Sequence, residues 1–216
     1  MTTRMERIGI IGAMEEEVMA LRQALTELQE HGTPFSDLPI FTGKLNGEAV
    51  VIAINSGVAG GLSPEVKIGQ IVIGHSAMQH DFDVNNFGYP QGTIPRLETS
   101  IFKGDSRLVN LATTAAQSQV GPSNVHQGLV VSGDQFVSSL DQKQRILESF
   151  PAATCVEMEG AAIAHVAWLN QVPHVIVRAI SDQADNTAPD DFDAYLLEII
   201  PTLNGVISKL VSLLKD

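Results

Sequence analysis

Carboxylate side chains follow three separate apolar stretches of this chain. Glu17 lies shortly after the first stretch, whereas Glu157 with Glu159, and then Asp182, follow two later ones. Apolar stretches of this length are typical of buried strands, and α/β proteins bind ligands where such strands end. Carboxyl groups at these places can accept hydrogen bonds from a bound molecule or exchange protons with it. Three acidic strand ends in one chain therefore indicate a site.

Each acidic position also has a purely structural interpretation. The acidic run that ends at Glu17 would form the first turn of a helix, where negative charge is favourable against the helix dipole. Glu157 and Glu159 would be a helix-start carboxylate and a solvated neighbour, and Asp182 resembles a residue at a loop entry or a helix cap. No single carboxylate decides between the two interpretations.

Length, composition and charge narrow the class of protein. With 216 residues and 44% hydrophobic content, we expect one domain spanning residues 1–216. The formal charge of −12 and the lack of a Lys/Arg cluster argue against nucleic acid or an anionic membrane as partner. A small molecule or another protein is the favoured partner.

The remaining reactive residue types predict no further chemistry. Cys155 is the single cysteine, and its apolar neighbours indicate a packed, inert thiol. The six histidines show no metal-ligand spacing, so no metal is expected. Neither a G-x-S-x-G elbow nor a Walker A sequence occurs. Because no apolar run reaches membrane-spanning length and none reads as a signal segment, we expect a cytoplasmic protein.

Strand and helix patterns largely alternate along the chain, which favours an α/β fold. Strands are expected at 8–11, 49–54, 68–73, 128–131, 154–156 and 175–180, and helices at 15–29, 106–118, 141–149, 159–170 and 192–214. Asn46-Gly47 between two apolar runs predicts a hairpin, which would make the sheet mixed. The polar segment 80–99, with four Gly or Pro residues and three aromatic ones, predicts a long functional or interface loop.

Glycine-rich segments follow two of the expected strands. Gly9-x-x-Gly12 is only a fragment of a dinucleotide fingerprint, because acidic residues stand where a diphosphate would bind. The segment 55–61 is rich in small residues, which lets the backbone approach a ligand closely, although a plain turn is the alternative.

Five motifs together resemble the 5′-methylthioadenosine/S-adenosylhomocysteine nucleosidase family. They are GIIGAMEEE at 9–17, NSGVAGG at 55–61, VSGDQF at 131–136, VEME at 156–159 and RAISD at 178–182. The resemblance covers nearly the whole chain. It implies the nucleoside phosphorylase-like α/β fold, with a central mixed sheet flanked by helices. It also implies a cofactor-free homodimer.

The resemblance gives each carboxylate a role in breaking an N-glycosidic bond. Asp182 would carry a proton to the departing purine, which requires a raised pKa that an apolar strand end can provide by desolvation. Glu159 would hold the ribose hydroxyls as the sugar becomes cationic. Glu17 would activate water on the opposite face of the sugar, as in inverting glycoside hydrolysis.

The same resemblance implies a set of substrate-binding residues. Phe136 would stack on adenine, Val137 would bind the base edge through its backbone, Ser181 would help to place Asp182, and Arg178 would lie near the water. Met158 would pack against the ribose, and Ala59, Gly60 and Glu157 are further substrate-binding positions. Met14 and Phe192 would line an apolar 5′-alkylthio pocket, to which the 80–99 loop of a second subunit would contribute Val84, Phe87 and Pro95.

Two departures from the family pattern stand out. Relatives usually carry a turn, a helix and another strand where Ile54 here runs straight into Asn55, a gap of most of a βαβ unit, or about thirty residues. Val58 stands where some relatives place a hydroxyl near the attacking water.

The resemblance implies hydrolysis of methylthioadenosine and S-adenosylhomocysteine to adenine and the thioribose. One alternative is hydrolysis of another 6-amino nucleoside such as aminodeoxyfutalosine, because the 5′ pocket is least determined by the sequence. A phosphorylase is disfavoured, since no Arg/Ser constellation for phosphate occurs beyond Arg178. A further alternative is a shortened, noncatalytic homologue that binds adenosine-like ligands.

Overall fold

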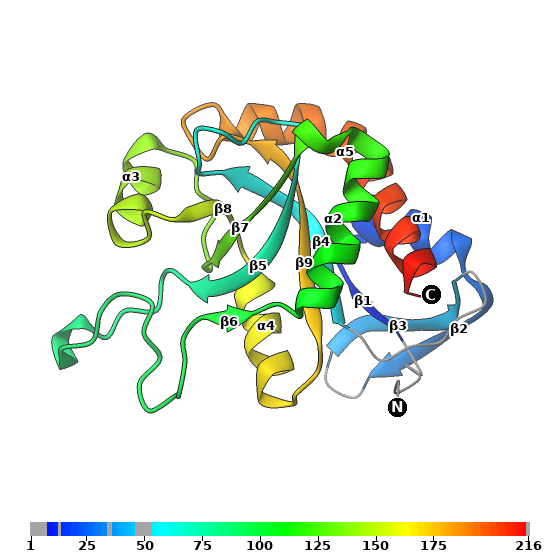
Figure 1. The fold of residues 1–216 in the computed structure, drawn as a ribbon, viewed down its shortest axis with the longest axis horizontal. Helices are drawn as coiled ribbons and strands as arrows, with labels where there is room; N and C mark the ends of the chain where they lie inside the picture. The colour runs from blue at the N-terminus through cyan, green and yellow to red at the C-terminus, as the bar shows by residue number, and fades with distance from the viewer. Residues whose placement is uncertain (1–7, 13, 34–35, 46–52, 215–216) are drawn as a thin grey trace.

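A mixed sheet forms the centre of the protein. The computed structural model describes residues 8–12, 14–33, 36–45 and 53–214, and Figure 1 shows helices on both sides of the sheet. The seven strands are β1 (Gly9–Ile11), β4 (Ala53–Gly61), β5 (Ile71–Gln79), β6 (Phe102–Lys103), β7 (Val125–Ser132), β8 (Ala153–Glu157) and β9 (His174–Asp182). Their order is β1-β4-β8-β7-β5-β6, and β9 pairs with both β4 and β5. The pairings β4-β8-β7-β5-β9 therefore close on themselves.

Helices cover the two faces of this sheet. The helices are α1 (Glu15–Ala24), α2 (Ser106–Val120), α3 (Leu140–Ser149), α4 (Gly160–Leu169) and α5 (Ala188–Leu213), with short 3₁₀ turns η1 (Asn85–Phe87) and η2 (Pro122–Asn124). Helices α1, α2 and α5 pack together on one face, and α4 packs on the other. Helix α3 lies beside one end of the sheet (Figure 1).

Alternation along the strands divides the core between these two layers. Ile71 and Ile73 of β5 face the α2 and α5 layer, whereas Val72 between them faces α4. In β9, Val177 faces the first layer and Ile176 the second. Both faces are apolar, as expected of strands buried on both sides. The predicted α/β class with a central mixed sheet is confirmed.

Several element boundaries differ from the sequence-based expectation, and two of the differences have a clear local cause. Helix α1 ends at Ala24 instead of continuing to residue 29, and β2 (Thr26–Thr33) begins there because it pairs with β3 (Ser36–Lys44). This tertiary pairing overrides a helix-compatible pattern. Strand β5 begins at Ile71 instead of residue 68, because Gly69 has a φ of +84° in a turn closed by a hydrogen bond from Gln70 to Lys67.

The sheet is mixed for a different reason than the predicted hairpin. β8 runs antiparallel to β4, and β9 runs antiparallel to β5. The β2–β3 hairpin forms a separate two-stranded sheet. The Asn46-Gly47 prediction and the first part of the predicted strand 49–54 lie outside the described residues. The β2–β3 pair is a different hairpin from the one predicted at Asn46-Gly47, and it adds no strand to the central sheet.

Strand β4 passes without a break through the point where the chain departs from the family pattern. Ile54 pairs with Ile10 of β1 and with Val175 of β9, and Asn55 continues both ladders. The following residues extend β4 to Gly61, where it meets β8. One continuous strand therefore connects the β1 side of the sheet to the segment rich in small residues.

Helix α5 contains a longer apolar segment than the sequence analysis predicted for any part of the chain. The segment Ala194–Leu213 has a mean hydropathy of 1.4 and is long and apolar enough to cross a membrane. By length and composition alone, the prediction that no apolar run reaches membrane-spanning length is therefore wrong. However, Leu203, Ile207 and Leu210 of this helix are completely buried in the cluster that α5 forms with α2 and β9. A core helix passes the same test of length and composition.

Candidate active site

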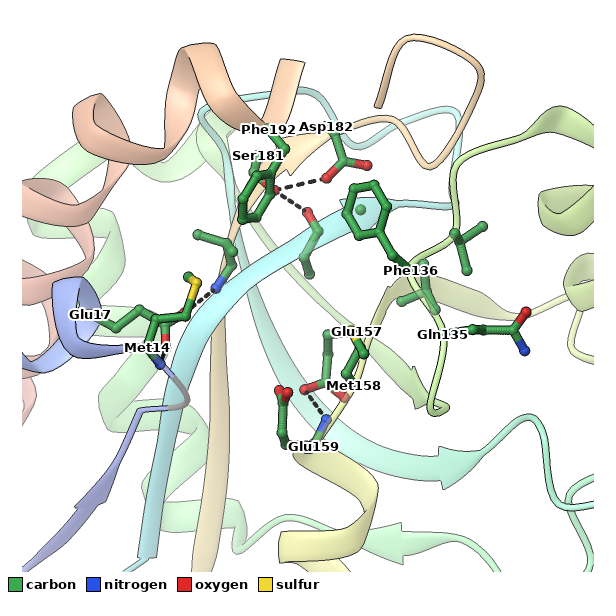
Figure 2. A pocket seen from close by; sticks show the side chains of 15 residues that line it. Met14, Glu17, Gln135, Phe136, Glu157, Met158, Glu159, Ser181, Asp182 and Phe192 are labelled. Carbon is green, nitrogen blue, oxygen red and sulfur yellow. Dashed lines mark hydrogen bonds between the residues drawn. The ribbon is translucent and has the colours of Figure 1, made fainter. Parts of the chain in front are cut away.

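A cavity of about 300 Å³ lies where β4, β8, β9 and the start of α1 meet. Figure 2 shows Glu17 and Met14 on one side of it, Asp182 and Phe136 on another, and Glu159 below. The lining residues are Met14, Glu17, Val58, Ala59, Gly60, Gln135, Phe136, Val137, Val156, Glu157, Met158, Glu159, Ser181, Asp182 and Phe192. The three acidic strand ends therefore meet at one site.

Glu17 combines a helix-capping role with a place in the cavity. Its carboxylate accepts hydrogen bonds from the backbone N–H of Met14, at 3.1 Å, and from that of Val58 on β4, at 3.2 Å. The first bond satisfies a free N–H at the start of α1, as a glutamate in the first helical turn can do. The side chain is only 2% exposed. Two backbone donors thus fix the carboxylate between α1 and β4.

Asp182 ends β9 as a buried carboxyl group with two hydrogen-bond donors. Oδ2 accepts from the Ser181 hydroxyl at 2.9 Å, and Oδ1 accepts from the Ala184 N–H at 2.7 Å. Burial raises the pKa of Asp182 above its ordinary value, and the nearby carboxylates of Asp191 and Asp185 raise it further. The two hydrogen bonds act in the opposite direction. Because burial is the largest effect, the group holds its proton to a higher pH than a solvated aspartate.

Two glycines of β4 let the charged side chains approach the backbone. A Cβ on Gly57 would lie 2.3 Å from Nη1 of Arg178 and 2.7 Å from Oε1 of Glu17. A Cβ on Gly60 would lie 2.8 Å from Oδ1 of Asp182. Real Cβ atoms are not found this close to other heavy atoms, so only glycine fits at these positions without rearrangement. The glycine-rich segment is therefore required by the side chains of the site.

Glu157 and Arg178 form a buried ion pair beneath the cavity. The Glu157 carboxylate also accepts hydrogen bonds from the Ser132 hydroxyl and from the Gly160 N–H at the start of α4. Burial alone would raise the pKa of Glu157, but Arg178, Ser132 and Gly160 together outweigh burial and lower it. Glu157 is thus held as an anion that caps α4 and neutralises Arg178.

Glu159 is the carboxylate of this segment that faces the cavity. It is the N-cap residue of α4, its side chain is 42% exposed, and its Oε2 lies 3.8 Å from Nη2 of Arg178. Burial raises its pKa, as do the neighbouring carboxylates of Glu157 and Glu17, whereas Arg178 lowers it. Its exposed oxygens can accept hydrogen bonds from a ligand.

Aromatic and sulfur-containing side chains form the apolar part of the cavity. Phe136 and Phe192 contact each other edge to face, with ring centroids 5.8 Å apart. Phe136 and Met158 are each 42% exposed, although both are large apolar residues. Exposed apolar surface inside a cavity is available for a planar or apolar ligand group.

The structure separates the remaining predicted residues from the cavity. Arg178 is 2% exposed and lies under the site, where it binds Glu157. Val84, Phe87 and Pro95 belong to the segment between β5 and β6 and do not line the cavity of this chain. Gln135 and Val156 line the cavity as well and were not among the predicted site residues, although each is adjacent to one. Their neighbours in the motifs at 131–136 and 156–159 were the available signal.

Within the described part of the chain, no group of three or more His, Cys, Asp or Glu side chains is arranged to hold a metal ion. Cys155 is completely buried in the core cluster on the α4 face. Burial raises the pKa of its thiol, as expected of a packed and inert cysteine.

Comparisons with known proteins agree with this geometry. A model of the phosphorylase superfamily matches residues 53–214. The chain is 38% identical, over 215 aligned positions, to a 5′-methylthioadenosine/S-adenosylhomocysteine nucleosidase of Actinobacillus succinogenes, covering 88% of this chain and 91% of the relative.

Two solved structures of nucleoside hydrolases also match this chain over nearly its whole length. The nucleosidase of that name from Neisseria meningitidis, in complex with methylthio-immucillin-A, matches with a TM-score of 0.89 and 33% identity, covering 95% of this chain and 98% of that one. Futalosine hydrolase of Helicobacter pylori matches with a TM-score of 0.85 and 29% identity, covering 96% and 98%. The family model, the sequence identity and the shared fold together show that this chain belongs to the 5′-methylthioadenosine/S-adenosylhomocysteine nucleosidase family of the phosphorylase superfamily.

Proposed function

We propose that this protein hydrolyses the N-glycosidic bond of 5′-methylthioadenosine and S-adenosylhomocysteine, releasing adenine and the thioribose. The observation that carries the proposal is the placement of Asp182 and Glu17 on different sides of one cavity, with Glu159 below them in the view of Figure 2. Bond cleavage at a sugar needs an acid for the leaving group and a base for water on opposite faces of the ring. The family membership supports the same reaction.

Asp182 is the proposed acid. Its pKa is raised by burial, so the protonated form persists to a higher pH than in a solvated aspartate. Phe136, with its exposed ring in the same part of the cavity, is placed to stack on the purine. A proton from Asp182 to nitrogen 7 of the base would neutralise the negative charge that develops as the bond to the sugar breaks.

Glu17 and Glu159 are the proposed partners of the sugar and the water. Glu159 would accept hydrogen bonds from the ribose hydroxyls, and its charge would stabilise the cationic sugar of the transition state. Glu17, held by two backbone N–H groups, would accept a proton from the attacking water. Val58 offers the Glu17 carboxylate only its backbone N–H, whereas some relatives are expected to have a hydroxyl there.

The charge of the cavity supports water over phosphate as the nucleophile. None of the described lining residues is a lysine or an arginine, whereas four are carboxylates. Arg178 is not available to a phosphate, because it is buried against Glu157. A phosphate dianion normally requires cationic side chains or several backbone donors. The proposed reaction is therefore hydrolysis and not phosphorolysis.

Adenine release from methylthioadenosine, followed by chromatography with and without phosphate, tests the proposal. Phosphate-independent release, with free thioribose as the second product, is the expected result. Formation of a sugar phosphate would show a phosphorylase. Binding of methylthioadenosine without release would show a noncatalytic homologue.

A second candidate substrate is an aminodeoxyfutalosine-type nucleoside. The observation that favours it is the likeness to futalosine hydrolase of Helicobacter pylori. Met14 and Phe192 are the lining residues proposed for the 5′ group, and an apolar contact of this kind restricts the 5′ substituent less than hydrogen bonds do. Competition between the two nucleosides at equal concentration, with both products quantified, would rank them.

The site is proposed to be completed by a second copy of the chain. Phe87 is 80% exposed and, with Val84 and Pro95, lies on the segment between β5 and β6, which extends away from the body of the protein in Figure 1. In a homodimer these apolar residues would cover the 5′ end of the partner's cavity. Light scattering would give the mass in solution. Phe87→Asp is expected to weaken association and to raise KM, whereas a monomeric wild type with full activity would contradict the proposal.

A further inference from the structure

A lysine outside the cavity contacts the peptide group that binds Asp182. Lys143 lies on α3, and its Nζ donates hydrogen bonds to the carbonyl of Gly61, at 2.8 Å, and to the carbonyl of Gln183, at 2.7 Å. The Gln183 carbonyl and the Ala184 N–H are the two ends of one peptide group. That N–H donates to Oδ1 of Asp182 at 2.7 Å. A single peptide thus connects the Lys143 ammonium to the carboxyl group.

The backbone at this peptide is strained and closely packed. Ala184 has a φ of +50°, a conformation that residues other than glycine rarely adopt. The residue is completely buried, and a Cβ on Gly60 would lie 2.9 Å from the Ala184 Cβ. Strained residues persist only where surrounding contacts hold them. Lys143 supplies such a contact on the carbonyl side, and Asp182 supplies one on the N–H side.

Several charged side chains lie near Lys143 and Asp182, the two groups that this peptide connects. Lys143 interacts with Asp185, Asp182 and Lys67, and burial lowers its own pKa. Asp182 faces Asp185 and Asp191 in addition. The positive charge of Lys143 opposes the effect of burial on Asp182, and a polarised peptide donates a stronger hydrogen bond to the carboxyl group.

We propose that Lys143 is a positioning residue of the nucleosidase site, whose ammonium holds the Gln183–Ala184 peptide and thereby sets the orientation of Asp182. The proposal rests on the proposed function, in which Asp182 acts as the acid. Lys143 is not among the residues that line the cavity, so its effect would be exerted through the backbone. Removing it would let the peptide relax and would remove a nearby positive charge.

Lys143→Met tests this role, with Lys67→Met as the matched control. Lys67 is a nearby lysine whose ammonium binds the Pro64 carbonyl and not the Gln183 peptide. In Lys143→Met, kcat is expected to fall about tenfold while KM stays within about twofold, because the acid is displaced but the cavity is intact. Loss of the ammonium and weakening of the Ala184 hydrogen bond both raise the pKa of Asp182. The alkaline limb of the pH–kcat profile should therefore move to higher pH.

Two outcomes would overturn the proposal. One is an unchanged alkaline limb in Lys143→Met, and the other is an equal displacement in Lys67→Met. Lys143→Arg keeps a cation and is expected to retain part of the wild-type profile, which preserves the test if the methionine variant does not fold.

A measurement without turnover separates this inference from the proposed function. Carbon-13 NMR of the aspartate carboxyl groups can follow the titration of Asp182, assigned by the signal that disappears in Asp182→Asn. A higher titration midpoint in Lys143→Met than in the wild type would support the role of Lys143 even if no nucleoside were hydrolysed. Equal midpoints would overturn it, whereas absence of adenine release from the wild type would count against the proposed function alone.

Discussion

The guanidinium of Arg178 and the carboxylate of Glu157 pair beneath the cavity, with both side chains only 2% exposed. Arg178 comes from β9 and Glu157 from the end of β8, two strands that are not direct neighbours in the sheet. The pair therefore connects β9, which ends at Asp182, with the end of β8, which Glu159 follows by two residues. We expect both the geometry of the site and the stability of the fold to depend on this ion pair.

Arg178→Met should be strongly destabilising, because it leaves Glu157 buried without its counter-ion. Removal of one partner of a buried pair costs about 3–5 kcal/mol. Arg145→Met is the matched control, since Arg145 pairs with Asp141 on the exposed surface of α3. An exposed pair of this spacing contributes only about 0.3–0.5 kcal/mol. Chemical denaturation of both variants measures the difference, and equal losses would contradict the inferred importance of the buried pair.

The lowered pKa of Glu157 predicts how stability depends on acid. A carboxylate whose pKa is lower when folded contributes stability above its unfolded-state pKa and loses it as the pH falls through the folded-state value. Ser132→Ala removes one hydrogen bond that lowers the pKa of Glu157, so the stability that this carboxylate contributes at neutral pH should be smaller, and its loss should be complete at a higher pH, than in the wild type. The free energy of unfolding, measured from neutral to acidic pH, checks this prediction. Coincident curves would show that the Ser132 bond has no such effect.

Asp182→Asn should abolish hydrolysis and leave the fold intact. Asparagine keeps an oxygen that can accept from the Ala184 N–H and adds an amide that can donate to the Ser181 hydroxyl, but it has no acidic proton to transfer. Loss of a general acid lowers the rate by about 10²–10⁴-fold. Adenine release gives the rate, and circular dichroism with thermal unfolding verifies the fold. Wild-type activity in this variant would rule out the proposed acid.

Gly57→Ala should impair both activity and stability. The added Cβ would meet the Arg178 guanidinium and the Glu17 carboxylate, and relieving such a clash in a packed interior costs about 1–3 kcal/mol. Gly205→Ala on α5 is the control, because its Cβ would meet only the end of the flexible Gln119 side chain. An alanine in a helix is favoured over glycine by about 1 kcal/mol, so this variant should be at least as stable as the wild type. Similar losses in both variants would contradict the assigned role of Gly57.

The fold class and the gathering of the acidic groups could both be predicted from local patterns along the chain. Apolar stretches such as Gly128–Val131 have no polar side chain, so they are expected to be buried, and their alternation with amphipathic segments leaves few architectures. The five motifs placed Glu17 and Asp182 at strand ends, and the family comparison confirmed the resemblance. The catalytic roles of these residues stay predictions.

The surroundings of each carboxylate could not be predicted in this way, because they depend on the three-dimensional fold. Glu157 and Glu159 are two residues apart and alike in sequence, yet Glu157 is buried against Arg178 while Glu159 faces the cavity. The difference arises because β8 ends at Glu157 and α4 begins at Gly160, so the backbone turns between them. The early end of α1, the Lys143 contact and the raised pKa of Asp182 likewise depend on neighbours far away in the chain. Local sequence patterns predict the secondary structure that a segment prefers. The burial of a side chain and its pKa depend instead on the residues that the fold places next to it.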